Sequence, residues 1–134
     1  MPCQGDGALM DDAIPEIPSF SVTMRLRTVS MANVREHWAV RAKRNRDHRL
    51  AVGAQFVWCP EYLKATPFPL VVTFTRYGKR LLDDDNLSGS FKSIRDEVAA
   101  QLGRDDNPRA GITWVYRQEK SKEYLIKILV EAVA

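Results

Sequence analysis

The sequence predicts an α+β fold, with a small mixed sheet of about four strands and two main helices in the order β-α-β-α-β-β. Three observations lead to this prediction. Four short segments have the alternating or β-branched composition of strands. Two longer segments place apolar side chains at helical spacing. The chain has 134 residues, of which 45% are hydrophobic, and this suffices for a single domain with its own core.

The first 18 residues differ in composition from the rest of the chain. They contain four acidic side chains and no Lys or Arg, together with Gly and Pro. We expect residues 1–18 to form a flexible leader and residues 19–134 to form the folded domain. The leader lacks the basic and then apolar order of a signal peptide, and no apolar run approaches the ~20 residues that span a bilayer. We therefore expect a cytoplasmic protein with no membrane partner.

Four segments are predicted to be strands. Residues 20–29 alternate between apolar and polar side chains, and residues 68–76 are rich in β-branched and aromatic side chains. Residues 112–117 and 124–130 complete the set, the last alternating strongly around Lys127. Together these segments are expected to form the sheet.

The first predicted helix covers residues 34–58. Asn33 can cap its start, and Pro60 ends it. At about 100° per residue, one stripe of this helix is formed by Val34, Trp38, Val52 and Phe56. Residues 41–49, RAKRNRDHR, lie between Trp38 and Val52 and are polar on nearly every face of the helix. We therefore expect this segment to project into solvent or onto a ligand.

The second predicted helix covers residues 86–102. Asn86 is a suitable N-cap, and Gly103 is a suitable stop. A narrow apolar arc is formed by Leu87, Phe91, Ile94, Val98 and Leu102. This helix is therefore expected to cover one face of the sheet.

Positive charge is concentrated near the first helix, although the net charge of the chain is only +3. Residues 24–49 contain eight Lys and Arg side chains against only Glu36 and Asp47. Such a local excess can attract a polyanion, although a solvated basic helix face would have the same composition. The candidate DNA-binding residues are Arg35, Arg41, Lys43, Arg44, Arg46 and Arg49. His37 and His48 lie on the same helix. One of them could act as a catalytic base, or both could be ordinary surface residues.

Three adjacent carboxylates precede the second helix, at Asp83, Asp84 and Asp85. They repel one another, so stability alone gives no reason to cluster them. In an extended segment Asp83 and Asp85 would point to the same side, where their oxygens could bind Mg²⁺. The alternative is a solvated turn that caps the helix.

Two further features follow along the chain. Asp105 and Asp106 come just after the second helix, and either could supply a third carboxylate, within one subunit or across a dimer. An ordinary surface turn is the alternative. Lys92 could reach a phosphate near the acidic site, or it could pair with Asp96 one helical turn later.

The segment LDDDNLSGSFKSIRDEVAAQLGRDD resembles the RusA family of crossover-junction endonucleases. Four features match in order along the chain. An Asp-x-Asp-Asn-Leu motif begins at Asp83, Lys92 and Asp96 follow on the next helix, and an Asp-Asp pair ends at Asp106. The upstream stretch ANVREHWAVRAKRNR resembles the family's Asn-x-x-x-Trp segment with its arginines. One departure is an apparent insertion, Ser-Gly-Ser, before Phe91 and Lys92, which places the lysine farther from the motif than in the family.

The resemblance implies a Mg²⁺-dependent endodeoxyribonuclease, with Mn²⁺ as a substitute metal, that resolves Holliday junctions by paired symmetric nicks as a homodimer. It implies that Asp83, Asp85 and Asp106 hold the metal and that Lys92 acts on the scissile phosphate. It also makes a phage origin plausible. The alternatives are a non-catalytic nucleic-acid-binding protein, a nuclease for other branched DNA, and a small interaction protein whose acidic turn only caps a helix.

Overall fold

A four-stranded mixed sheet forms the centre of the protein, confirming the predicted α+β class. The computed structural model describes residues 19–29, 37–104 and 111–133. The strands stand in the order β2-β5-β3-β4. Their bounds are Ser19–Met24 for β2, Leu70–Gly78 for β3, Ile112–Lys120 for β4 and Leu125–Ala132 for β5. The predicted leader lies outside the described residues.

Strand β3 lies between two partners of opposite direction. It pairs with β4 in parallel, from Leu70 opposite Ile112 to Gly78 opposite Lys120. It pairs with β5 antiparallel, and β5 pairs with β2 antiparallel. Residues 121–124 therefore carry the chain past the end of β3, where the Ser121 N–H donates to the Gly78 carbonyl at 2.8 Å.

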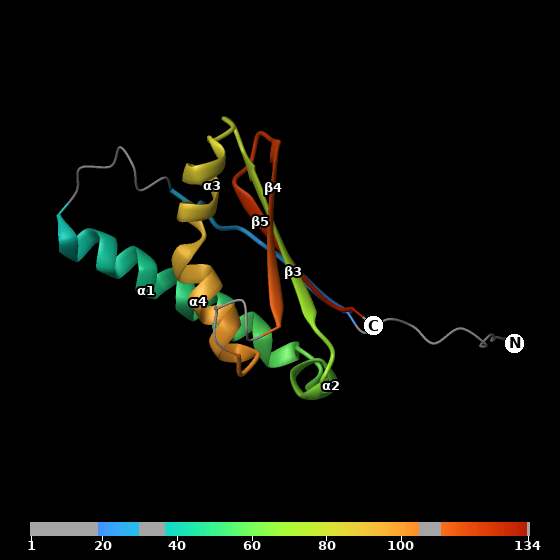
Figure 1. Cartoon of the computed structure of the whole chain (residues 1–134). Helices are drawn as coiled ribbons and strands as arrows, with labels where there is room; N and C mark the ends of the chain where they lie inside the picture. The colour runs from blue at the N-terminus through green and yellow to red at the C-terminus, as the bar shows by residue number, and fades with distance from the viewer. Residues whose placement is uncertain (1–18, 30–36, 105–110, 134) are drawn as a thin grey trace, which may run out of the picture.

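Helices α1, α3 and α4 lie together on one side of the sheet (Figure 1). The helix bounds are Trp38–Gln55 for α1, Phe56–Trp58 for the 3-10 turn η2, Glu61–Ala65 for α2, Asp84–Ser90 for α3 and Lys92–Gln101 for α4. Helix α1 packs against α4, and its N-terminal half extends away from the sheet (Figure 1). No helix in the described ranges is both long and apolar enough to cross a bilayer.

The core lies between the helices and one face of the sheet. Alternate residues of β3 and β5 are fully buried, among them Val72, Phe74 and Ile128. Phe91 stacks on Phe74 with ring centroids 4.9 Å apart. The buried side chains that the helices add are Val52, Phe56, Leu63, Leu87, Ile94, Val98 and Leu102. Every member of the arc predicted for the second helix is thus in the core.

The second predicted helix has a different start and is divided. It begins at Asp84 with Asp83 as N-cap, so the prediction that Asn86 is the cap is wrong. It breaks at Phe91 (φ −99°, ψ 5°), immediately after the poor helix formers Ser-Gly-Ser. The break leaves Phe91 fully buried between the two parts.

The first predicted helix is also shorter than expected. The described part begins at Trp38, with His37 as N-cap and its Nδ1 accepting from the Ala39 N–H at 3.1 Å. The predicted cap, Asn33, lies outside the described residues. Trp38 is 74% exposed, so its place on a buried stripe is wrong. The α-helix ends at Gln55, five residues before Pro60, and a 3-10 turn follows to Trp58. Pro60 is instead the N-cap of α2, which was not predicted.

Candidate active site and basic helix

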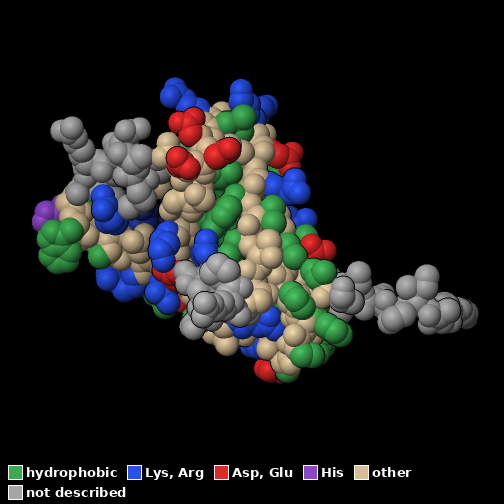
Figure 2. Space-filling model, viewed as in Figure 1, with side chains coloured by type: hydrophobic (Ala, Val, Ile, Leu, Met, Phe, Trp, Pro, Cys, Tyr) green, Lys and Arg blue, Asp and Glu red, His purple; other side chains and the backbone are tan. Residues whose placement is uncertain are grey.

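Three consecutive carboxylates form the exposed start of helix α3. Asp83 is the N-cap residue, and Asp84 and Asp85 lie in the first turn. Figure 2 shows acidic side chains gathered at this end of the molecule. The Asp83 side chain makes no capping hydrogen bond. Within the part of the chain that the structure describes, none of the three carboxylates takes part in a hydrogen bond or ion pair, so the cap interpretation has no contact to support it.

The extended geometry expected for this segment is wrong for Asp85. Because Asp85 lies in a helical turn, the alternation of side chains along a strand does not relate it to Asp83. Both residues instead lie at the N-terminus of α3, where the helix dipole favours negative charge. The grouping of the two carboxylates therefore comes from the helix start.

The chain just before Asp83 is held by a side chain from β4. The Leu82 N–H donates to Gln118 Oε1 at 2.8 Å, and Gln118 Nε2 donates to the Leu82 carbonyl at 2.7 Å. Gln118 therefore satisfies both the N–H and the carbonyl of Leu82 and fixes the backbone at this residue. The sequence offers no signal for this role, because the contact joins positions 36 residues apart.

A buried arginine, Arg76, bonds to the chain two residues before Leu82. Arg76 on β3 is 5% exposed; its Nη1 donates to the Arg80 carbonyl at 2.8 Å and its Nε to Thr28 Oγ1 at 3.1 Å. Burial lowers the pKa of Arg76 from its ordinary value. Sequence reasoning missed this residue, although it continues the alternation of the buried residues Val72 and Phe74.

Lys92 begins helix α4 and pairs with Asp96. Its Nζ donates to both carboxylate oxygens of Asp96, at 2.7 and 3.0 Å. The lysine side chain remains 68% exposed and the aspartate 32%. Of the two roles left open for Lys92, the structure shows the pair with Asp96, and the exposed side chain lies at a surface that a phosphate can reach.

The proposed third carboxylate cannot be placed beside the first two. Asp105 and Asp106 both lie outside the described residues. Among the residues that are described, no group of three or more His, Cys, Asp or Glu side chains is close enough to hold a metal ion. The choice of Asp83 and Asp85 as candidate ligands therefore rests on the resemblance of their motif.

The basic side chains of α1 point in several directions. Lys43 and Arg46 are exposed, and Lys43 pairs with Asp47 at 2.8 Å. Arg49 pairs with Glu97 of α4 at 3.1 Å. Arg41 and Arg44 are half-buried, and Arg35 lies outside the described residues. Figure 2 shows Lys and Arg side chains along α1, below the acidic end of the molecule.

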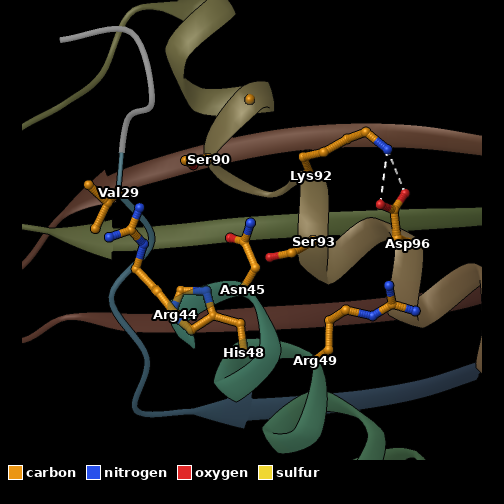
Figure 3. Close-up of a pocket in the computed structure, with 10 residues that line it drawn as sticks. Val29, Arg44, Asn45, His48, Arg49, Ser90, Lys92, Ser93 and Asp96 are labelled. Carbon is orange, nitrogen blue, oxygen red and sulfur yellow. Dashed lines mark hydrogen bonds and ion pairs between the residues drawn. The ribbon is translucent and has the colours of Figure 1, made fainter. Parts of the chain in front are cut away.

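A pocket of about 220 Å³ separates α1 from the start of α4, and we call it the α1–α4 pocket. Figure 3 shows Asn45 pointing toward Ser93, while Arg44 and His48 lie on the side of Val29. Burial, followed by the positive charge of Arg44, lowers the pKa of His48 despite the opposing effect of Asp47. The pocket's lining residues are Val29, Arg44, Asn45, His48, Arg49, Gly89, Ser90, Lys92, Ser93 and Asp96. Sequence reasoning singled out several of these residues but could not group them.

Comparisons with known proteins give no family assignment. No protein-family model and no curated protein sequence matches the chain. Among solved structures, the chain is similar to hydrogenase maturation protein HypE in complex with ATP, at 17% identity and a TM-score of 0.29. That match covers 97% of this chain and 34% of the other. A TM-score this low does not indicate a shared fold.

Proposed function

We propose that this protein is a Mg²⁺-dependent, structure-selective endodeoxyribonuclease of the RusA type, which cuts Holliday junctions as a homodimer. One observation carries the proposal: three exposed carboxylates at the start of α3 make no hydrogen bond or ion pair within the described part of the chain, while Gln118 fixes the backbone just before them. Charge repulsion makes such a cluster costly unless a cation neutralises it. A divalent ion is the simplest cation that does so.

The chemistry of the donors suits Mg²⁺. Carboxylate oxygens are the hard ligands that this ion prefers, and it commonly binds through one or two carboxylates plus phosphate oxygens. Asp83 and Asp85 would hold it, with Asp106 as the proposed third ligand. When bound, Mg²⁺ supplies Lewis-acid activation of the attacking water and of the scissile phosphate.

Lys92 would place a positive charge beside the scissile phosphate. Its pair with Asp96 keeps the ammonium at the start of α4 while leaving the side chain mostly exposed. A fixed positive charge at this place stabilises the negative charge that grows during phosphodiester hydrolysis. Asp96 is therefore proposed as a positioning residue for Lys92.

The basic helix would supply most of the affinity for DNA. Arg41, Lys43, Arg44, Arg46 and Arg49 lie along α1, which packs directly on α4. Contacts of such side chains with phosphates are independent of sequence and weaken steeply with salt. Recognition by branched shape suits contacts of this kind. A twofold dimer would provide the two active sites that paired nicks require.

A cleavage assay with end-labelled DNA tests the proposal. The protein is incubated with a four-way junction, a flap and a linear duplex, each with Mg²⁺ or with EDTA. We expect paired symmetric nicks in the junction, only with Mg²⁺, and little cutting of the linear duplex. Junction that is bound but never cut would instead support a non-catalytic binding protein. Faster cutting of the flap would support a nuclease for other branched DNA.

A further inference from the structure

We propose that the α1–α4 pocket is a binding site for a second backbone phosphate, next to the phosphate that is cut. The inference rests on the proposed function only in assigning this phosphate to DNA. The pocket shares Lys92 and its positioning residue Asp96 with the proposed active site, whereas Asn45, His48 and Ser93 belong to neither the acidic cluster nor the metal site. A phosphate held there would fix the register of the strand that is cut.

The charges that line the pocket favour an anion. Among the described residues, three cationic side chains, Arg44, Arg49 and Lys92, line it against one carboxylate, Asp96. Glu97, which pairs with Arg49, brings a second carboxylate to the border of the pocket. The balance remains positive, and the pocket walls exclude part of the water that would otherwise screen it.

Two neutral polar side chains in the pocket have no partner in the described chain. Asn45 on α1 and Ser93 on α4 point toward one another across the pocket (Figure 3). Both are half-buried, and neither side chain takes part in a hydrogen bond with the described residues. The Asn45 amide N–H groups and the Ser93 hydroxyl are therefore available as donors to a ligand with acceptor oxygens.

Helix α4 adds a field of the same sign. Lys92 and Ser93 are its first two residues, and the helix runs for ten residues. The N-terminus of a helix carries partial positive charge, and its first backbone N–H groups lack helical acceptors. The geometry thus combines Arg44, the Asn45 amide, the Ser93 hydroxyl and a helix N-terminus around one pocket, which is the chemistry that recognises phosphate.

His48 provides a direct reporter of occupancy. The charges that act on it come from Arg44 and Asp47 of its own helix, while Lys92 and Asp96 of α4 line the same pocket. Arg44 disfavours the protonated imidazole. An anion in the pocket would oppose that effect and raise the pKa of His48.

The test uses sulfate as the probe, because its charge does not change over the range in which histidine titrates. NMR spectra of the full chain are recorded without DNA or metal, with sulfate replacing chloride at constant ionic strength. We expect saturable shifts of the Asn45, His48 and Ser93 signals and a rise in the pKa of His48. Arg44→Gln and Ser93→Ala are each expected to weaken sulfate binding by about tenfold, the loss typical of a charge-assisted contact.

Lys43→Gln is the matched control, because it removes the same charge from α1 at a position outside the pocket. It should change sulfate binding by no more than about twofold, as expected for an exposed charge. Equal losses in Arg44→Gln and Lys43→Gln, or no saturable shift at His48, would overturn the proposal. Sulfate binding by a protein that cuts no junction would uphold the pocket and reject the nuclease. Junction cutting without sulfate binding would uphold the nuclease and reject the pocket as a phosphate site.

Discussion

Gln118 and Leu82 form a two-point clamp between strand β4 and the chain that leads into the acidic cluster. The glutamine accepts from the Leu82 N–H at 2.8 Å and donates to the Leu82 carbonyl at 2.7 Å. Because the next residue is Asp83, the clamp sets where helix α3 begins. A side chain from a distant strand therefore positions the start of the proposed active site.

Replacing this glutamine should loosen the acidic cluster. Gln118→Ala removes two partly buried hydrogen bonds, so we expect it to lower the free energy of unfolding by roughly 1–3 kcal/mol. Urea unfolding measures the stability, and single-turnover cleavage measures whether Asp83 and Asp85 remain in place. The neighbouring exposed Glu119→Ala is the control. If Gln118→Ala has the stability and the cleavage rate of wild type, the clamp does not position Asp83 and Asp85.

Arg76 should be essential for stability even though it is charged. Arg76→Met leaves the buried Thr28 hydroxyl and the partly buried Arg80 carbonyl without their donor. We expect a loss of roughly 1–3 kcal/mol in unfolding free energy, because unsatisfied buried groups are costly. Arg25→Met is a matched control, since Arg25 pairs with Glu123 while 82% exposed. That exposed pair should contribute less than about 1 kcal/mol. Equal losses in the two variants would contradict the role assigned to Arg76.

His48 should make the stability of the protein depend on pH. Its pKa is lowered in the folded state from the ordinary value of 6.5, mainly by burial. As the pH falls through 6.5, the unfolded chain therefore takes up a proton before the folded chain does, and stability falls. Wild-type protein should lose more stability than His48→Gln between about pH 7.5 and about pH 5.5. Urea unfolding at both pH values measures this, and equal losses would reject it.

The strands and most of the core could be predicted from the sequence because they follow local patterns. Alternation identified the strand at residues 124–130, and the structure places β5 at Leu125–Ala132. The apolar arc from Leu87 to Leu102 was correct because every member is buried in the core. Helix boundaries were less predictable. Asp83 and Asn86 are both good caps, and the structure begins the helix at Asp83, directly after the residue that Gln118 holds from β4, a contact that local sequence does not encode.

The candidate site could be predicted only in part. The acidic triplet, Lys92 and the basic helix were recognisable as residue types at suggestive spacing. Tertiary packing determines the rest. The α1–α4 pocket forms where two helices pack, and this packing brings Asn45 and Ser93, which are far apart in the sequence, to the same cavity. Trp38 was misplaced because the N-terminal half of α1 extends away from the sheet that would have buried it.

The central claim is that Asp83 and Asp85 hold Mg²⁺ for the cleavage of branched DNA. Its most direct test is single-turnover cleavage of a labelled four-way junction by Asp85→Asn with Mg²⁺, with Asp84→Asn as the control for lost charge. We expect Asp85→Asn to bind the junction as tightly as wild type, or more tightly, yet not to cut it, while Asp84→Asn cuts. Cleavage by Asp85→Asn at the wild-type rate would show that Asp85 is not a ligand of the catalytic metal.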